Sequence, residues 1–301
     1  MHSFTTVGIL YPGELGAALG SLLEKNGIRV VTTLNGRSQR TVRLGRAAGL
    51  TVLDSLSDVV READVVVSVV PPDAAATLAD QYAELAALSP AGAIYVDVNS
   101  IGPKLVRSVG DRISAGGRSF VDASVRGPAG NLAAGATLYL SGARAGEIAT
   151  LFEDAMRVRV LGREIGRASA MKMILTGIPK GISALFVEVA ALALREGMLK
   201  EMNEELARFD PGVVSAVERM LPTYPRHAGR RVAEIAELEE TCRGAGQEPC
   251  MFRAVRSIFE EFAAVDFDDG GGRWTVASII EHLVNKDFLA TDAAVAPAGV
   301  S

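Results

Sequence analysis

The stretch from residue 5 to residue 37 limits the fold of this chain more than any other. It opens with a short apolar run, Val7–Leu10, of the length and branching typical of a buried strand. The turn Tyr11–Gly16 follows, and leucines at helical spacing continue to Asn26–Gly27, which is a helix stop. A second apolar run, Ile28–Leu34, completes a strand–helix–strand unit of about thirty residues, the size of the unit that binds a dinucleotide.

The turn carries two of the three glycines of a dinucleotide-binding fingerprint. The pattern G-x-G-x-x-G falls on Tyr11, Gly13 and Gly16, so a tyrosine replaces the first glycine. Gly13 allows the backbone to approach a pyrophosphate, and Gly16 allows close packing of helix on strand. Phosphates would bind the free N–H groups at the helix start, where the dipole favours an anion. An ordinary tight turn is the alternative reading. The candidate cofactor-binding residues here are Tyr11, Pro12, Gly13, Glu14 and Leu15.

The end of the second strand indicates which dinucleotide would bind. NAD-specific sites place an acid there to hold the ribose hydroxyls, but this chain has Asn35, Arg37 and Ser38, and no acid until Asp54. A guanidinium beside a hydroxyl suits the extra phosphate of NADP(H). A charged hydrogen bond of about 1.5–3 kcal/mol corresponds to a tenfold to hundredfold preference. A solvated surface arginine is the alternative.

Composition excludes several classes of protein. The chain has 301 residues, enough for two domains, with 49% hydrophobic and 22% charged residues, which is ordinary globular composition. The net charge of −5 provides no basic field for nucleic acid. Two cysteines and three scattered histidines indicate neither a disulfide framework nor a metal site. We expect no signal peptide, no membrane span (the apolar stretch Gly181–Leu194 is too short and contains Glu188) and a cytoplasmic location.

Strands and helices alternate along the first half of the chain. The strongest strand is Ala63–Val70, which is nearly all valine, as in a central parallel strand. Asp73 is a plausible N-cap for a helix through Ala87, and Ala93–Val98 is another buried strand. This alternation predicts a doubly wound (Rossmann) parallel sheet. Ligands bind beyond the carboxyl ends of such strands, which adds Val70, Pro71, Pro72, Asn99 and Ser100 to the candidates.

The second half is predicted to be all helical. Residues 166–198 form one long helix with a kink near Pro179, and further helices are expected at 202–208, 211–221, 226–243, 249–264 and 275–288. We therefore expect a dinucleotide-binding domain over 1–163, a helical substrate and dimerisation domain over 164–290, and a flexible tail over 291–301.

Three further segments could carry chemistry. Residues 122–138 are expected to form a long glycine-rich loop in which Arg126 could fix a carboxylate or phosphate, the alternative being a flexible connection. Lys172 lies among apolar sequence neighbours that would disfavour its charge, and Thr176 is one helical turn further on. Lys180 is two turns on, and His227 begins a charged segment that could equally be a solvated helix face.

These segments together resemble the β-hydroxyacid dehydrogenases, typified by 3-hydroxyisobutyrate dehydrogenase and related to 6-phosphogluconate dehydrogenase. The resemblance rests on the glycine turn, NSIGP after a strand, DASVRGPAG and GRASAMK, and it covers the first 200 residues. The remainder resembles the branch with a phosphogluconate-dehydrogenase-like helical domain. The resemblance implies a nicotinamide-dependent oxidation of a 3-hydroxyacid, or its reverse, in a homodimer. It also implies that Lys172 is the general acid/base. The implied substrate-binding residues are Ser100, Ser124, Arg126, Gly127, Thr176, Lys180 and His227, with Asn99 and Ser100 beside the nicotinamide.

The chain departs from the family pattern at three places. Arg126, Gly127 and Pro128 replace a serine and two glycines, Thr176 replaces an asparagine, and Tyr11 replaces the first nucleotide glycine. Arg126 suggests a different or more anionic substrate. We therefore predict an NADP(H)-dependent oxidoreductase that interconverts a hydroxyl and a carbonyl. The alternatives are an imine reductase, a group similar in sequence that usually lacks the lysine, and a non-catalytic NADP(H)-binding protein.

Overall fold

The computed structural model describes residues 4–88, 92–267 and 273–290. The chain divides into two compact units, Met1–Met173 and Ile174–Ser301, which we call the nucleotide unit and the helical unit. The division falls later in the chain than the boundary expected at residues 163–164, because the start of the long helix is held by the nucleotide unit. The tail expected over 291–301 lies outside the described residues.

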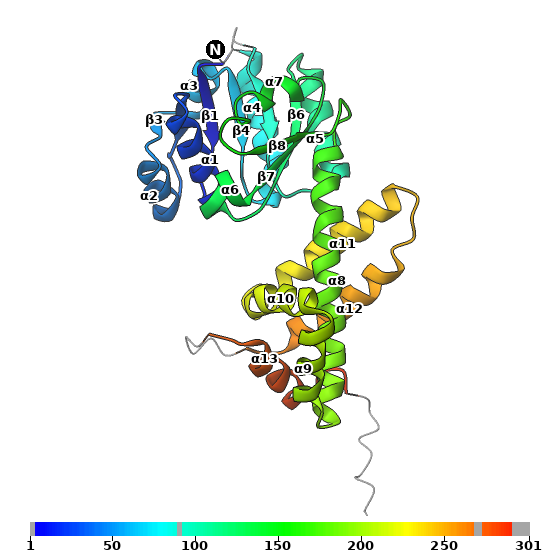
Figure 1. The fold of residues 1–301 in the computed structure, drawn as a ribbon. Helices are drawn as coiled ribbons and strands as arrows, with labels where there is room; N and C mark the ends of the chain where they lie inside the picture. Colours follow the sequence, from blue (N-terminus) through cyan, green and yellow to red (C-terminus); the bar gives the residue numbers. More distant parts are fainter. Residues whose placement is uncertain (1–3, 89–91, 268–272, 291–301) are drawn as a thin grey trace, which may run out of the picture. The chain divides into compact units, whose positions relative to one another are not determined.

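The nucleotide unit is built on an eight-stranded sheet with the order β3-β2-β1-β4-β5-β6-β7-β8 (Figure 1). Neighbouring strands are parallel except for β6 and β7, which are antiparallel, so the predicted doubly wound sheet is confirmed with one reversed pair. The strands are β1 (Thr6–Leu10), β2 (Arg29–Thr33), β3 (Thr51–Leu53), β4 (Val65–Ser68), β5 (Ile94–Asp97), β6 (Phe120–Arg126), β7 (Thr137–Ser141) and β8 (Arg157–Val160).

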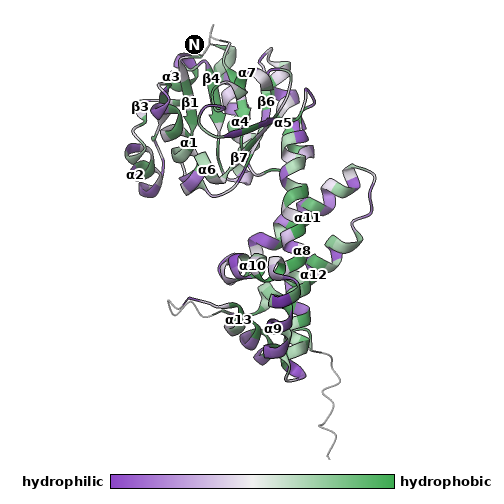
Figure 2. Cartoon of the chain, viewed as in Figure 1, coloured by the Kyte–Doolittle hydropathy of each residue, from purple (hydrophilic) through white to green (hydrophobic). Residues whose placement is uncertain are grey.

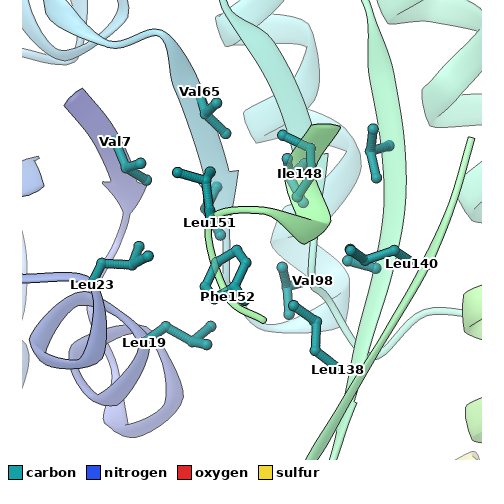
Figure 3. Packing of buried hydrophobic residues seen from close by; sticks show 14 of the residues in the cluster. Val7, Leu19, Leu23, Val65, Val98, Leu138, Leu140, Ile148, Leu151 and Phe152 are labelled. Atoms are coloured by element: carbon teal, nitrogen blue, oxygen red, sulfur yellow. The ribbon is translucent and has the colours of Figure 1, made fainter. Parts of the chain in front are cut away.

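Helices cover both faces of this sheet, because its central strands are apolar on both sides. On one face Leu19 and Leu23 of α1 (Glu14–Lys25) pack with the segment around α7 (Ala145–Ala149), as Figure 3 shows. The opposite core contains side chains from α3 (Leu56–Glu62), α4 (Ala75–Ala87) and α5 (Pro103–Ala115). The remaining helices of this unit are α2 (Gln39–Ala47), α6 (Leu132–Gly135) and the short 3₁₀ helices η1 (Pro72–Ala74) and η2 (Ala129–Asn131).

Two local predictions in this unit are wrong. Residues 122–138 are not one long loop, because β6 continues to Arg126 and η2 and α6 precede β7. The glycines suggested a loop, whereas the apolar alternation before Arg126 favours the strand. Asp73 does not cap α4. It lies within η1, and Ala74 occupies the N-cap position with no side-chain cap.

The helical unit begins within the 29-residue helix α8 (Arg167–Arg195), which runs continuously through Pro179. Its core gathers apolar side chains from α8 and from the helices that follow, including Phe259 and Phe262. Those elements are α9 (Leu199–Phe209), α10 (Pro211–Met220), η3 (Leu221–Thr223), α11 (Ala228–Gly244), α12 (Cys250–Ala264) and α13 (Val276–Asn285). The expected all-helical second half is therefore confirmed for the residues described.

Helix α8 lies within the range 166–198 predicted for one long helix, and its apolar residues (Figure 2) are not confined to the stretch Gly181–Leu194. By length and composition it could cross a membrane, since an 18-residue window reaches a mean hydropathy of 1.6, so the expectation that it is too short is wrong. Half of that window is buried within the protein. A single helix of this kind is weak evidence for a membrane span.

Candidate functional site

A cavity of about 450 Å³ lies at the carboxyl ends of β1, β2 and β4, where doubly wound sheets bind ligands. Its floor and walls come from the turn after β1, the turn after β2, the segment after β4 and one face of α4. The lining residues are Tyr11, Gly13, Gly36, Arg37, Ser38, Thr41, Val69, Val70, Pro71, Ala74, Thr77, Leu78 and Gln81. None of these lining residues is acidic.

Gly13 and Gly16, the two glycines of the first turn, have different surroundings. A Cβ on Gly16 would lie 3.3 Å from Ile9 Cγ2, so this glycine serves the packing of α1 on β1. A Cβ on Gly13 would meet nothing within 4 Å, and the Gly13 backbone (φ −74°) suits any residue. The folded chain alone therefore does not require Gly13. The space in front of it, beside a helix start with no side-chain cap, fits the close approach of a pyrophosphate.

Tyr11 and Arg37 both line the cavity and contact each other. The Arg37 guanidinium carbon lies 4.1 Å from the centroid of the Tyr11 ring, a cation–π contact. The Nε of Arg37 donates to the Asn35 carbonyl at 3.3 Å, and Ser38 caps α2 by accepting from the Thr41 amide at 3.2 Å. The tyrosine in place of the first fingerprint glycine thus supports the arginine that follows β2.

A buried polar network joins the carboxyl ends of β4 and β5. Asn99 Oδ1 accepts from the Val70 amide at 2.6 Å, and Asn99 Nδ2 donates to Ser68 Oγ at 3.0 Å and to Asp97 Oδ2 at 2.9 Å. The Asn99 amide also donates to Asp97 Oδ1 at 2.9 Å. Burial raises the pKa of Asp97 to about 7, although the hydrogen bonds from Asn99 act to lower it. This network fixes Val70, which lines the cavity.

Lys172 and Ser100 meet directly beyond this network. The Nζ of Lys172, in the second turn of α8, donates to Ser100 Oγ at 2.6 Å. Ser100 follows Asn99 in the chain, so the lysine is connected to the cavity wall through Ser100, Asn99 and Val70. The apolar sequence neighbours of Lys172 do not enclose it, because Ile174 is 58% exposed and Lys172 itself is only half-buried.

A buried carboxylate fixes the start of α8. Asp122 in β6 accepts from the backbone amides of Gly166, Ala168 and Ser169 at 2.9–3.1 Å, and its Oδ1 accepts from Ser169 Oγ at 2.7 Å. Ser141 Oγ also donates to Asp122, at 2.9 Å. A negative charge at a helix N-terminus is favourable, and these bonds set the position from which Lys172 projects.

Comparison with known proteins agrees with this geometry. The model of the NAD binding domain of 6-phosphogluconate dehydrogenase matches residues 6–156, half of the chain. A solved structure of a conserved protein, described as structurally similar to 3-hydroxyacid dehydrogenases, is 32% identical with a TM-score of 0.70. That alignment covers 85% of this chain and 96% of the other. The chain belongs to the β-hydroxyacid dehydrogenase family.

A second family model and two further proteins match the helical unit of this β-hydroxyacid dehydrogenase family member as well. A domain of unknown function (DUF1932) matches residues 193–262. A conserved hypothetical protein from Sinorhizobium meliloti 1021 is 26% identical, with a TM-score of 0.73 and coverage of 95% of this chain and 98% of the other. An uncharacterized 28.5 kDa protein from Methanothermus fervidus is 26% identical over 84% of this chain and 97% of its own length.

The predicted cofactor-binding residues of the family member divide into two groups. Six line the cavity, namely Tyr11, Gly13, Arg37, Ser38, Val70 and Pro71. The other six, Pro12, Glu14, Leu15, Asn35, Pro72 and Asn99, are not among the residues that line it. Leu15 packs against the core, Glu14 pairs with Arg40, and Asn35 donates to the Asp54 carbonyl.

The predicted substrate residues in β6 and directly after it also differ in their surroundings. Ser124 is fully buried and its Oγ donates to the Ala168 carbonyl at 2.7 Å, so it holds α8. Gly127 has φ +136°, and a Cβ there would lie 2.4 Å from the Gly135 carbonyl oxygen. The positive φ and the close approach of this carbonyl therefore require a glycine at position 127, whatever the protein binds. Arg126 is exposed at the end of β6 and makes no ion pair with any residue that the structure describes.

Three predicted substrate residues belong to the helical unit. Thr176 is half-buried on α8, and Lys180 is buried and paired with Glu234. His227 is exposed at the N-cap of α11 and lines a cavity of about 1160 Å³ with Arg219, Arg226 and Trp274. Among the described residues, no group of three His, Cys, Asp or Glu side chains could hold a metal ion.

Sequence reasoning missed several residues of the site. Thr77 and Gln81 of α4 line the cavity, and their spacing with Ala74 and Leu78 marks one helix face. That face could have been found from its position after β4. The sequence predicts Asp122 at the start of a loop, although an acid between apolar strand residues, VDASV, is an unusual pattern that indicates a buried partner.

Proposed function

We propose that this protein is an NADP(H)-dependent oxidoreductase that interconverts a hydroxyl and a carbonyl on a small, anionic, 3-hydroxyacid-like substrate. The observation that carries the proposal is the Lys172–Ser100 contact of 2.6 Å, connected through Asn99 to the cavity wall at Val70. A lysine in this position provides a general acid/base beside the cofactor cavity, within the same unit.

Each residue of the site would have its own role in the reaction. A bound nicotinamide supplies the hydride chemistry. Lys172 donates a proton from Nζ to the substrate oxygen during reduction and accepts one during oxidation. Ser100 accepts from Nζ and so directs the lysine, while Asp122 fixes the helix that carries it. Arg126, exposed at the end of β6, is available to pair with an anionic group of the substrate.

The preference for NADP(H) is supported by Arg37, Ser38 and Thr41 in the cavity lining and by the absence of an acid among the residues that form it. The Arg37 guanidinium, stacked on Tyr11, presents a planar fork that suits a 2′-phosphate. Titration with NADPH and NADH, read by thermal unfolding, tests this. The wild type should bind NADPH about tenfold to hundredfold more tightly, and Arg37→Gln should remove the difference.

The Lys172→Ala variant tests the reaction itself. Initial rates would be measured with short 3-hydroxyacids and NADP⁺, including 3-hydroxyisobutyrate, and with cyclic imines and NADPH. Turnover of the hydroxyacid should fall by about 10²–10⁴-fold while the affinity for NADPH stays unchanged. Lys104→Ala, an exposed lysine of the same unit, is the matched control. Full turnover in Lys172→Ala would overturn the assignment, and turnover of imines alone would favour an imine reductase.

A homodimer and a cytoplasmic location remain predictions, and one feature supports the dimer. Helix α8 exposes Ile174, Ile178, Leu185, Val189 and Leu192 at 43–66% of their surface. Their spacing places them along one side of the helix. An apolar groove of about 550 Å³ adjoins this stripe at Val189, Leu192 and Met198. An apolar stripe that the described residues leave exposed is typical of an interface, and we propose a second copy of the chain as its partner.

A further inference from the structure

In the helical unit, one carboxylate is shared by three cationic side chains. Glu234 of α11 accepts at Oε2 from Lys180 Nζ at 3.1 Å and from Arg231 Nη1 at 3.0 Å. Its Oε1 lies 3.4 Å from Arg230 Nε. One negative charge against three positive charges leaves the group with a formal excess of two positive charges.

Two of the three cations, Lys180 and Arg231, are largely removed from water, whereas the Arg230 side chain is 60% exposed. Lys180 is 3% exposed, and the Arg231 side chain is 16% exposed. An ammonium group has three N–H donors, but within the described part of the chain Lys180 Nζ has Glu234 as its acceptor and no other. The Nε of Arg231 is buried and has no acceptor among those residues. Buried donors without an acceptor in the protein are rare, so Arg231 Nε is available to an acceptor from outside the chain.

The surrounding side chains hold these donors in place. The Arg231 guanidinium lies over the Tyr224 ring, 5.2 Å from its centroid. The Tyr224 hydroxyl donates to Ser183 Oγ at 3.3 Å, and Ser183 in turn donates to the Pro179 carbonyl, beside Lys180. Burial lowers the pKa of Lys180, and the charge of Glu234 opposes that shift. Lys180 and Arg231 are therefore prearranged on α8 and α11, while Arg230 lies at the exposed edge of the group.

A purely structural ion pair does not account for this arrangement. A buried pair is neutral as a whole and satisfies its donors, whereas this group has surplus charge and unused donors. We propose that Lys180, Arg230 and Arg231 form a binding site for a small oxyanion, the carboxylate or phosphate group of a small molecule, and that Glu234 is the counter-charge that orders them. The site lies within the helical unit and does not depend on the proposed reaction.

Direct binding of inorganic anions to the full chain, without cofactor, tests the proposal. Titrations with sodium phosphate and with malonate would be followed by calorimetry and thermal unfolding, with sodium chloride at equal ionic strength as reference. We expect saturable stabilisation by at least one of the two anions, and the more effective one identifies the group. Lys180→Met should weaken that binding at least tenfold. Lys200→Met, the same substitution at an exposed lysine of α9, should leave it unchanged.

A second pair of variants separates anion binding from a structural role. Glu234→Gln removes the competing negative charge, so anion affinity should rise several-fold. Arg230→Gln, at a side chain that is 60% exposed and tolerant of change, should weaken binding about threefold, which provides a test if Lys180→Met does not fold. Absence of saturable binding in the wild type, or unchanged anion affinity in Glu234→Gln, would overturn the site.

Discussion

At the scale of single residues, the space around each position of the first turn explains which residue it carries. Gly13 has open space where its Cβ would be, whereas Gly16 has Ile9 at 3.3 Å, although both belong to the same fingerprint. Tyr11 occupies the position of the missing glycine without positive φ and supports Arg37 through its ring. Departures from a motif are therefore understood only from the contacts that each residue makes.

Gly13→Ala should separate binding from folding. The added methyl group meets nothing in the folded chain but would occupy space in front of the helix start. We expect the affinity for NADPH to fall at least tenfold, with the free energy of unfolding changed by about 1 kcal/mol or less. Calorimetry and urea unfolding measure the two quantities. Gly146→Ala, at an equally open glycine of α7, is the control that should bind normally.

Asp97 should make stability depend on pH. The folded pKa of about 7 lies above the usual 3.8, so between about pH 4 and pH 7 the folded state retains a proton that the unfolded chain has released. The contribution of Asp97 to the free energy of unfolding therefore decreases by about 1.4 kcal/mol per pH unit as the pH rises through this window. Above about pH 7 this contribution no longer changes with pH. Urea unfolding from pH 5 to pH 8 measures the slope. Asp97→Asn should remove this slope, and parallel curves for the two proteins would contradict the assignment.

At the scale of secondary structure, α8 is positioned by its first turn. Its sequence is apolar enough to predict a helix, but no residue preceding it predicts the cap, which comes from Asp122, more than forty positions earlier in the chain. The strand β6 therefore decides where the helix begins, and with it where Lys172 lies relative to Ser100.

Asp122→Asn should loosen this anchor. An amide cannot accept the five hydrogen bonds that the carboxylate accepts, and it lacks the charge that favours the helix start. We expect a loss of about 2–4 kcal/mol in the free energy of unfolding, together with reduced turnover. Chemical denaturation checks the first value. Asp111→Asn, at an exposed acid of α5, is the comparison, and an equal small effect in both variants would refute the anchoring role.

At the scale of the whole molecule, the apolar stripe of α8 is left exposed by the residues that the structure describes. Exposed side chains such as Leu185 and Leu192 are 62% and 59% exposed, although the same helix contributes Val187 and Ala190 to the core. One helix therefore supplies both an interior face and an outward apolar face, and a second chain is the partner that we propose for the latter.

Leu185→Lys together with Leu192→Lys should weaken the proposed dimer. Two ammonium groups in an apolar interface would have to be desolvated without partners, so we expect mainly monomer at micromolar concentration. Sedimentation velocity or light scattering measures the mass. Leu88→Lys, at a leucine of the nucleotide unit that is 85% exposed, should leave the oligomeric state unchanged. A wild type that is monomeric throughout would disprove the dimer.

The sequence alone determined the order and type of most elements. Periodicity is a local property, so the valine run of β4, the leucines of α1 and the helices after Gly166 could be predicted directly. The turn at Gly13, Arg37 after β2 and the place of Lys172 were also visible, because motifs occupy short stretches. Predictions failed where glycine content suggested a loop over 122–138 and where Asp73 suggested a cap.

Only the tertiary structure decided which groups meet. Lys172 and Ser100 are 72 positions apart, and Asp122 accepts from the Ser169 amide 47 positions further along the chain. The pairing of Lys180 with Glu234 and the burial of Ser124 likewise come from packing between elements. Local sequence encodes the shape of each segment, whereas hydrogen bonds and charges between distant segments depend on how the chain folds back on itself.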